Sequence, residues 1–192
     1  MTARSDLLMY MGIINSTFVS IDGVINHMDA WHFAYTDEEA RQIAAEQLLA
    51  ADALLMGRKT YEGYAAVWPQ RQGVYPDKIN TMQKYVASGT LDKADWANTT
   101  VLKGDLVEEV AQLRRQDGDT IMHGFGPVAQ TLIMNGLLDM LHLWVHPQFA
   151  GVGTISDTLF SEGNNARLEL IATRTLSSGV VMLSYRVPGA ED

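Results

Sequence analysis

Two short apolar runs that each end close to a glycine constrain the fold of this chain more than any other feature. Residues 53–56 (ALLM) precede Gly57, and residues 120–122 (TIM) precede His123 and Gly124. Runs of this length without alternating polar residues are typical of strands that are buried on both faces of a parallel sheet. Each run leads into a segment that can begin a helix, so the pattern predicts the strand–helix units of an α/β fold.

The clearest helix is predicted at residues 37–51, where strong helix formers place apolar side chains on one stripe. Thr36 is its expected N-cap, and Glu39 three residues later completes a capping box. Residues 7–20 are rich in β-branched and aromatic side chains and predict a buried strand. The polar residues 58–75 carry no clear periodicity.

The remaining segments continue the alternation of strands and helices. Strands are predicted at 84–87, 99–102 and 141–145, and helices at 105–115 and 127–134. Residues 167–176 and 180–187 flank Ser177-Ser178-Gly179 and predict a β-hairpin. We therefore expect one domain over residues 1–192, with a mostly parallel central sheet that ends in an antiparallel hairpin.

Composition excludes several classes of function. The chain has 192 residues, 23 acidic against 14 basic, and a net charge of -9 with no basic block, which disfavours nucleic acid and anionic membranes as partners. Zero cysteines remove disulfides and thiolate metal sites. The first residues lack the apolar core of a signal peptide, and no apolar run approaches the length of a membrane span. We expect a cytoplasmic protein.

The glycine-rich turn at Gly124-Phe125-Gly126-Pro127 predicts an anion site. Glycine permits close approaches and backbone angles that a β-carbon forbids, and proline suits the first turn of a helix. Free N–H groups at that helix end could hold a pyrophosphate. Read through Ala129, the segment matches Gly-x-Gly-x-x-Ala, but it lies too late in the chain for a Rossmann motif and lacks the acid about 20 residues on. A tight turn without a ligand is the alternative.

A second candidate phosphate site follows the other apolar run. Gly57 is followed by Arg58, Lys59 and Thr60, which offer two cations and a hydroxyl. The alternative is a solvated helix start that carries surface charge. Ligands of open α/β sheets bind beyond the carboxyl ends of the strands, and both candidates lie at such ends.

Five motifs in order resemble the dihydrofolate reductase superfamily. They are Ser20-x-Asp22-Gly23, residues 55–62 (LMGRKTYE), residues 84–88 (KYVAS), His123-Gly124-x-Gly126, and the stretch from Leu138 to His146-Pro147. More narrowly, the chain is similar to the riboflavin-biosynthesis reductase domain and its stand-alone bacterial relatives. The resemblance covers nearly the whole chain and implies a three-layer, dihydrofolate-reductase-like fold.

The resemblance also implies NADPH as the cofactor and assigns residues to it. The implied cofactor-binding residues are Gly57, Arg58, Lys59, Thr60, Ser88, Gly124, Phe125, Gly126, Pro127 and Val128. Residues 22–31 lie where relatives carry a loop over the nicotinamide. The expected substrate-binding residues are Ser20, Asp22, Trp31 and Tyr61. With no cysteines, the chain departs from relatives that carry a zinc deaminase domain, so a reductase alone is expected.

Asp22 is the first choice for a proton donor because it lies on this loop, and an Asp-Gly turn is the alternative. Trp31 could stack on a planar ring or serve as a packing plug. True folate reductases carry a carboxylate on the first helix, and Asp37, Glu38 and Glu39 give no clear match, so folate is not assigned.

We predict no metal site. His142 and His146 share a face of their predicted strand, and His27 and His32 are close in sequence, but neither pair has an obvious third ligand. The functional prediction is an NADPH-dependent reductase of a pyrimidinone or pterin-like heterocycle, such as the riboflavin-pathway 5-amino-6-(5-phosphoribosylamino)uracil. The alternative is a nucleotide-binding module of the same fold without turnover. Apolar residues on parts of both faces of the C-terminal hairpin, among them Leu168 and Leu170, predict a homodimer.

Overall fold

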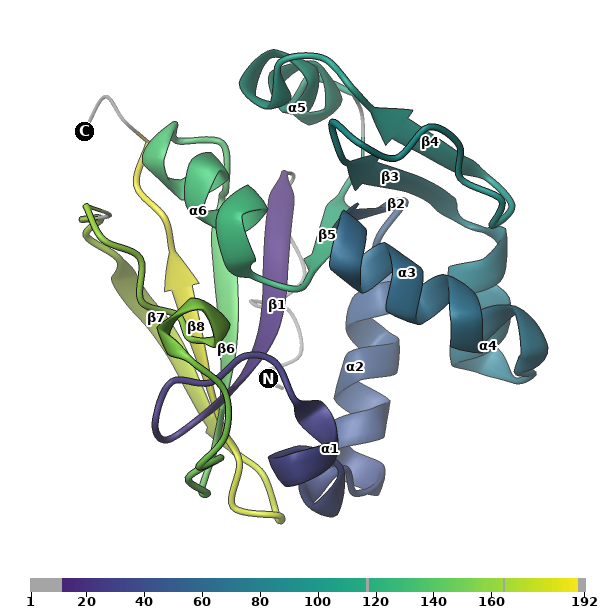
Figure 1. Ribbon diagram of the computed structural model, residues 1–192. Helices are drawn as coiled ribbons and strands as arrows, with labels where there is room; N and C mark the ends of the chain where they lie inside the picture. Colours follow the sequence, from purple (N-terminus) through teal and green to yellow (C-terminus); the bar gives the residue numbers. More distant parts are fainter. Residues whose placement is uncertain (1–11, 117, 164, 190–192) are drawn as a thin grey trace, which may run out of the picture.

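The computed structural model describes residues 12–116, 118–163 and 165–189 and contains one continuous eight-stranded sheet in the order β4-β3-β2-β5-β1-β6-β8-β7 (Figure 1). Strands β4, β3, β2, β5, β1 and β6 run parallel to one another. Strand β8 is antiparallel to both of its neighbours, β6 and β7. The strands are β1 (Ile13–Ser20), β2 (Ala53–Gly57), β3 (Gln83–Ala87), β4 (Thr99–Leu102), β5 (Thr120–His123), β6 (Met140–His146), β7 (Glu169–Thr175) and β8 (Val181–Arg186). The predicted fold class, a mostly parallel sheet with an antiparallel C-terminal hairpin, is confirmed.

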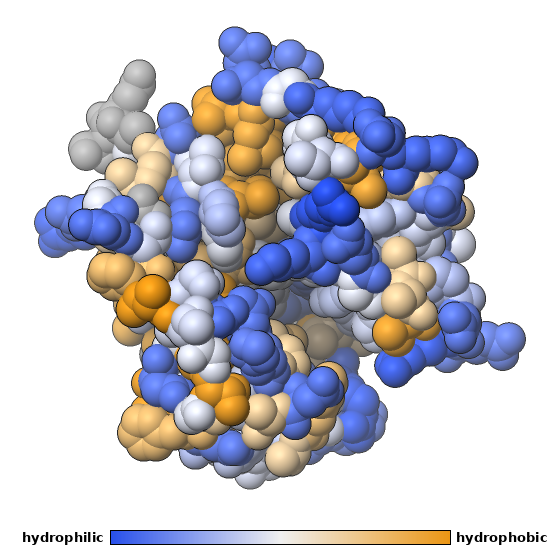
Figure 2. Space-filling view, in the orientation of Figure 1, coloured by the Kyte–Doolittle hydropathy of each residue, from blue (hydrophilic) through white to orange (hydrophobic). Residues whose placement is uncertain are grey.

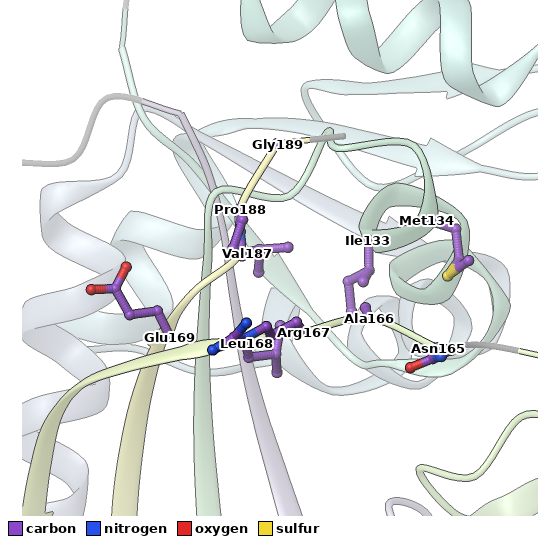
Figure 3. A pocket seen from close by; sticks show the side chains of 10 residues that line it. All are labelled: Ile133, Met134, Asn165, Ala166, Arg167, Leu168, Glu169, Val187, Pro188 and Gly189. Carbon is purple, nitrogen blue, oxygen red and sulfur yellow. The ribbon is translucent and has the colours of Figure 1, made fainter. Parts of the chain in front are cut away.

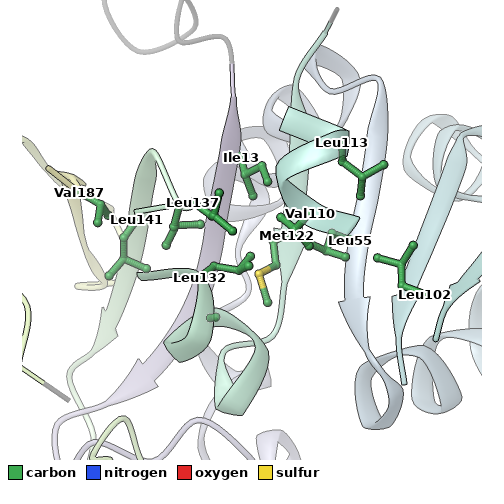
Figure 4. Packing of buried hydrophobic residues seen from close by; sticks show 12 residues of the cluster. Ile13, Leu55, Leu102, Val110, Leu113, Met122, Leu132, Leu137, Leu141 and Val187 are labelled. Carbon is green, nitrogen blue, oxygen red and sulfur yellow. The ribbon is translucent and has the colours of Figure 1, made fainter. Parts of the chain in front are cut away.

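Helices cover both faces of the sheet. The helices are α1 (Met28–Trp31), α2 (Glu38–Ala50), α3 (Arg58–Val67), α4 (Val74–Thr81), α5 (Leu106–Arg114) and α6 (Gly126–Met134), with short 3-10 turns at Phe33–Tyr35, Trp68–Gln70 and Ile155–Asp157. One apolar cluster lies under α5 and α6 and includes Leu55, Met122 and Leu132 (Figure 4). A second cluster lies under α2, α3 and α4. The sheet is therefore the middle of three layers.

The central strands are buried because they carry apolar side chains toward both layers. Leu54, Leu55 and Met56 of β2 are fully buried, with Leu55 in the α5–α6 cluster and its two neighbours in the other. A β-strand sends successive side chains to opposite faces, so an uninterrupted apolar run satisfies both layers at once. This explains why the run at residues 53–56 folds as a central strand.

The structure corrects one local prediction and gives the bounds of two further segments. The N-cap of α2 is Asp37, whose carboxylate accepts a hydrogen bond from the Ala40 amide at 2.8 Å, so the Thr36 capping box is wrong. The polar residues 58–75, which showed no clear periodicity, include all of α3 and the start of α4. The first strand begins at Ile13 within the described residues, and the predicted part at residues 7–11 lies outside them.

A β-bulge accounts for the apolar residues on both faces of the C-terminal hairpin. A register shift between Leu170 and Ala172 inserts Ile171 as an extra residue in β7. Such a β-bulge reverses the facing of the side chains that follow it, which explains why apolar residues occur on parts of both faces. Leu170 is 52% exposed on the outermost strand of the sheet.

Lys84 of β3 is a fully buried cation that ties this strand to the end of α4. Its ammonium donates to the carbonyl oxygens of Ile79, Asn80 and Met82 at 2.7 to 3.1 Å. It also lies 4.7 Å from the centre of the Trp96 ring. Burial lowers its pKa to about 8, so the group is still charged at pH 7 and can neutralise the negative end of the helix dipole.

Replacing this ammonium should therefore destabilise the fold. We expect Lys84→Met to lower the free energy of unfolding by about 2–4 kcal/mol at pH 7, because three carbonyls lose a charged donor. Urea denaturation measures the change. The control is Lys93→Met, whose exposed ion pair with Asp95 should contribute nothing measurable. Equal midpoints for the two variants would contradict the structural role of Lys84.

Candidate functional site

The two glycine-ended strands lie side by side and end together. β2 and β5 pair in parallel, with Met56 opposite His123, so Gly57 and Gly124 leave the sheet at the same edge. A β-carbon built on Gly124 would collide with the hydroxyl of Thr60, and one built on Gly57 would lie 3.4 Å from Val128. Gly124 has φ 79°, a conformation that favours glycine. The absence of side chains here lets the starts of α3 and α6 approach each other.

The starts of α3 and α6 are unlike those of the other long helices. α2 and α5 are capped by the carboxylates of Asp37 and Asp105 and carry glutamates in their first turns. α3 begins after Gly57 and α6 after Phe125, and neither has a side-chain cap or an acidic residue in its first turn. Their first N–H groups are therefore left available to an anion. Two such ends beside each other suit a ligand with linked phosphates.

Cationic and hydroxyl groups lie at the same place. The Arg58 guanidinium donates to Glu62 at 2.7 Å and to the Thr90 hydroxyl at 2.6 Å. Thr90 belongs to the turn after β3, in which the Ser88 hydroxyl accepts amide hydrogen bonds from Thr90 and Leu91. Through Thr90, Arg58 therefore links the start of α3 to the turn that contains Ser88. Figure 2 shows strongly hydrophilic side chains over this end of α3.

The end of β1 carries Ser20 and Asp22 in a closed turn. The Asp22 carboxylate accepts hydrogen bonds from the Ser20 hydroxyl and from the amides of Ala150 and Gly151, at 2.8 and 3.0 Å for the two amides. These bonds lower the pKa of Asp22 to about 2, with the Ser20 bond the largest cause. A carboxylate held ionised in this way ties the loop after β1 to the loop after β6. Its contacts favour the turn interpretation over proton donation.

Two other expected substrate residues point into packed regions. Trp31 is 1% exposed, donates from its indole to the Asn26 carbonyl, and packs against His146. Tyr61 is 5% exposed in the cluster under α3, where its hydroxyl accepts a hydrogen bond from the Trp96 amide. The structure thus buries both rings in packed regions, with Tyr61 against β2 and β5, rather than leaving them open to a ligand.

Polar residues that the sequence analysis missed lie at this edge instead. Asn15 of β1 is fully buried and donates to the carbonyl of Gly124 at 2.8 Å, while the Thr17 hydroxyl donates to Asn15 at 2.7 Å. His123 ends β5, and its Nδ1 lies 3.3 Å from the hydroxyl of Tyr64. The signal in the sequence was a run of three polar residues, Asn15, Ser16 and Thr17, inside a strand that is predicted to be buried.

Three other histidines, His32, His142 and His146, are buried and contact other protein groups. His32 Nδ1 lies 2.9 Å from His146 Nε2, and His142 Nδ1 lies 2.9 Å from the Ser184 hydroxyl. Burial lowers the pKa of His32 and of His142 to about 4. In the part of the chain that the structure describes, no cluster of three or more potential metal ligands occurs. None of the described helices has the length and apolarity to cross a membrane.

A separate hollow of about 640 Å³ lies elsewhere on the molecule (Figure 3). Its walls come from the C-terminal end of α6, the segment before β7 and the segment after β8, and include Met134, Arg167 and Pro188. The glycines lie at the other end of α6, about 12 Å away at 1.5 Å of rise per residue. This hollow therefore does not belong to the candidate phosphate site.

The geometry agrees with what comparison with known proteins shows. The family model of the RibD C-terminal domain matches residues 12–182. The chain belongs to the RibD C-terminal domain family. Protein YyaP of Bacillus subtilis (strain 168) is 30% identical over 145 residues, which cover 72% of this chain and 75% of YyaP. The resemblance predicted from the sequence motifs is confirmed.

Solved structures share the fold of this RibD C-terminal domain. A riboflavin biosynthesis protein from Shewanella sp. PV-4 matches with a TM-score of 0.73 and 19% identity, over 93% of this chain and 99% of that one. Dihydrofolate reductase from Enterococcus faecalis, complexed with NADP(H), matches with a TM-score of 0.61 and 19% identity, over 91% and 95% of the two chains. At these identities the likeness establishes the dihydrofolate-reductase-like fold.

The close approach of Thr60 to Gly124 gives a test. We expect Gly124→Ala to lower the free energy of unfolding by about 1–3 kcal/mol in urea denaturation, because the methyl group meets the Thr60 hydroxyl and the backbone is strained. Adding Thr60→Ala should recover part of this loss. The control is Gly63→Ala, within α3 and with open space around it, which should stabilise by about 0.5–1 kcal/mol. Equal effects at both glycines would contradict the described packing.

Proposed function

We propose that this RibD C-terminal domain is an NADPH-dependent reductase that transfers a hydride to a small heterocyclic substrate of the pyrimidinone or pterin type. The riboflavin-pathway 5-amino-6-(5-phosphoribosylamino)uracil is one such substrate. The observation that carries the proposal is the pair of uncapped helix starts, α3 and α6, beside each other at the ends of β2 and β5. Family membership and the fold shared with a dihydrofolate reductase complexed with NADP(H) support it.

The chain's residues fit a dinucleotide phosphate. The amides that begin α6 would hold the pyrophosphate, since the space beside Gly126 is open and permits close backbone approach. Arg58, Lys59 and the Thr90 hydroxyl would hold the phosphate on the adenosine ribose. Arg58 and Lys59 give this edge a local positive potential, although the net charge of the chain is -9.

The remaining task of the protein is to orient two planar rings and exclude water. Bound NADPH supplies the hydride, so the residues need no covalent chemistry. β1 runs on from Thr17 to Ser20 after its last pair with β5, and the substrate ring would lie beside this unpaired edge of β1. Asp22 would hold the loop after β1 in position through its bonds to Ala150 and Gly151.

Arg58 provides the test of cofactor choice. We expect Arg58→Ala to weaken NADPH binding about 10- to 100-fold in a fluorescence titration, because charged hydrogen bonds to phosphate are lost, and to leave NADH binding unchanged. The control is Arg41→Ala, which removes a similar exposed arginine–glutamate pair on α2. Equal binding of NADH and NADPH by the wild type would contradict the NADPH assignment. Tight NADPH binding without oxidation by pyrimidinone, pterin or quinone acceptors would favour the module without turnover.

We also propose that the protein forms a homodimer through the C-terminal hairpin. β7 is an edge strand, and edge strands with exposed apolar side chains readily pair with a second chain. Light scattering coupled to size-exclusion chromatography should give twice the chain mass of 21.2 kDa. Leu170→Asp should give the monomer mass, while Leu49→Asp, on the exposed side of α2, should not. A monomeric wild type would contradict the proposal.

A further inference from the structure

His123 occupies a position that the sequence motifs do not assign to any role. It is the last residue of β5, directly before Gly124, and it pairs in register with Ser16 of β1. It shares a face of β5 with Ile121, which packs in the cluster under α2, α3 and α4. The Tyr64 ring of α3 meets the imidazole edge to face at 5.9 Å between centres.

Tyr64 determines which imidazole nitrogen carries the proton. Burial raises the pKa of Tyr64 to about 12, so the hydroxyl keeps its proton and needs an acceptor. Among the described residues its hydrogen-bond partner is His123 Nδ1, at 3.3 Å. If Nδ1 were the donor, the hydroxyl proton would be left without a protein acceptor at a partly buried position, which is costly. Tyr64 therefore donates to Nδ1, and a neutral imidazole then carries its proton on Nε2.

The Nε2 atom has no hydrogen-bond partner among the described residues. Within the described part of the chain, the Ser178 hydroxyl is the only buried side-chain nitrogen or oxygen without a hydrogen-bond partner. His123 Nε2 also has no partner among the described residues, and because it is not one of these fully buried atoms, at least part of it is exposed. His32 and His146 differ, because both nitrogens of each ring contact other protein groups. His123 thus leaves Nε2 without a protein partner, as does His142, whose Nδ1 contacts Ser184, while His32 and His146 do not.

This donor lies where a substrate would meet the cofactor. The pairing of β1 with β5 ends at Ser16 and His123, and β1 then continues alone to Ser20. The next residue after His123 opens the loop to α6, where the pyrophosphate is proposed to bind. A ring bound beyond the end of this strand pairing would have the imidazole at its edge.

We propose that His123 is a substrate-binding residue, whose Nε2–H donates a hydrogen bond to a carbonyl oxygen or ring nitrogen of a planar, uncharged heterocycle. Tyr64 is then a positioning residue, since it fixes the imidazole tautomer. This inference rests on the proposed reductase function and names the group that recognises its substrate class. A neutral imidazole is suited to such a role, because it polarises a carbonyl without placing a charge beside it. Burial lowers the pKa of His123 to about 4, so the neutral form persists through the physiological range.

The test follows the imidazole directly. Protein labelled with 15N-histidine and saturated with NADP+ is titrated with uracil, a planar ring with two carbonyl acceptors, and long-range 1H–15N spectra are recorded. We expect the Nε2–H tautomer at His123 and a saturable shift of its ring signals, with those of His32 and His146 unchanged. Tyr64→Phe should mix the two tautomers. It should also weaken uracil binding, by up to about tenfold for one hydrogen bond.

Two variants separate hydrogen bonding from packing. His123→Gln keeps an N–H donor and should retain most of the uracil affinity, whereas His123→Leu should lose about tenfold. NADP+ affinity and melting temperature, measured on the same samples, report whether each variant is folded. An Nδ1–H tautomer, or no saturable response of His123 to uracil while NADP+ still binds, would overturn the assignment alone. Absence of NADP+ binding would overturn the proposed function and this assignment with it.

Discussion

Parallel pairing of β2 with β5 is the constraint on which the candidate site depends. These strands are distant in sequence, and their pairing places Met56 opposite His123, so both chains turn out of the sheet at one edge. The helices that follow then start next to each other. Close approach requires the missing side chain at Gly124, because a β-carbon there would meet Thr60. Without this register, the two helix starts would lie too far apart to bind the single ligand that we propose.

The helix starts at the candidate site differ in charge from those elsewhere in the chain. The chain is acidic overall, and its other long helices neutralise their own positive ends with Asp37, Asp105 or, in the first turn of α4, Asp77. The two helices at the glycine-ended strands are left without such groups. Since capping normally stabilises a helix, two adjacent uncapped ends support the proposal that an anion binds there. Arg58 adds a cation at the same edge.

The sequence predicts most of the strands and the two glycine-ended segments of the candidate site. Apolar runs such as 53–56 determine central strands because both faces must be buried. Long-range contacts were not predictable: the burial of Tyr61 against Trp96 and the bonds from the Ala150 and Gly151 amides to Asp22 depend on segments far apart in the chain. His123 lies within one of the sequence motifs, but its proposed role depends on its contact with Tyr64. The position of Tyr64 was not predictable, because residues 58–75 showed no clear helical periodicity.

Amide hydrogen exchange with and without NADPH tests the central claim most directly. One equivalent of NADPH should slow exchange in both residues 57–61 and residues 124–129, while the start of α5, which Asp105 already caps, should not change. Slowing in both segments at one-to-one stoichiometry is the predicted result. Slowing in only one of them, or in neither, would contradict the account that two glycine-ended strands hold a single dinucleotide.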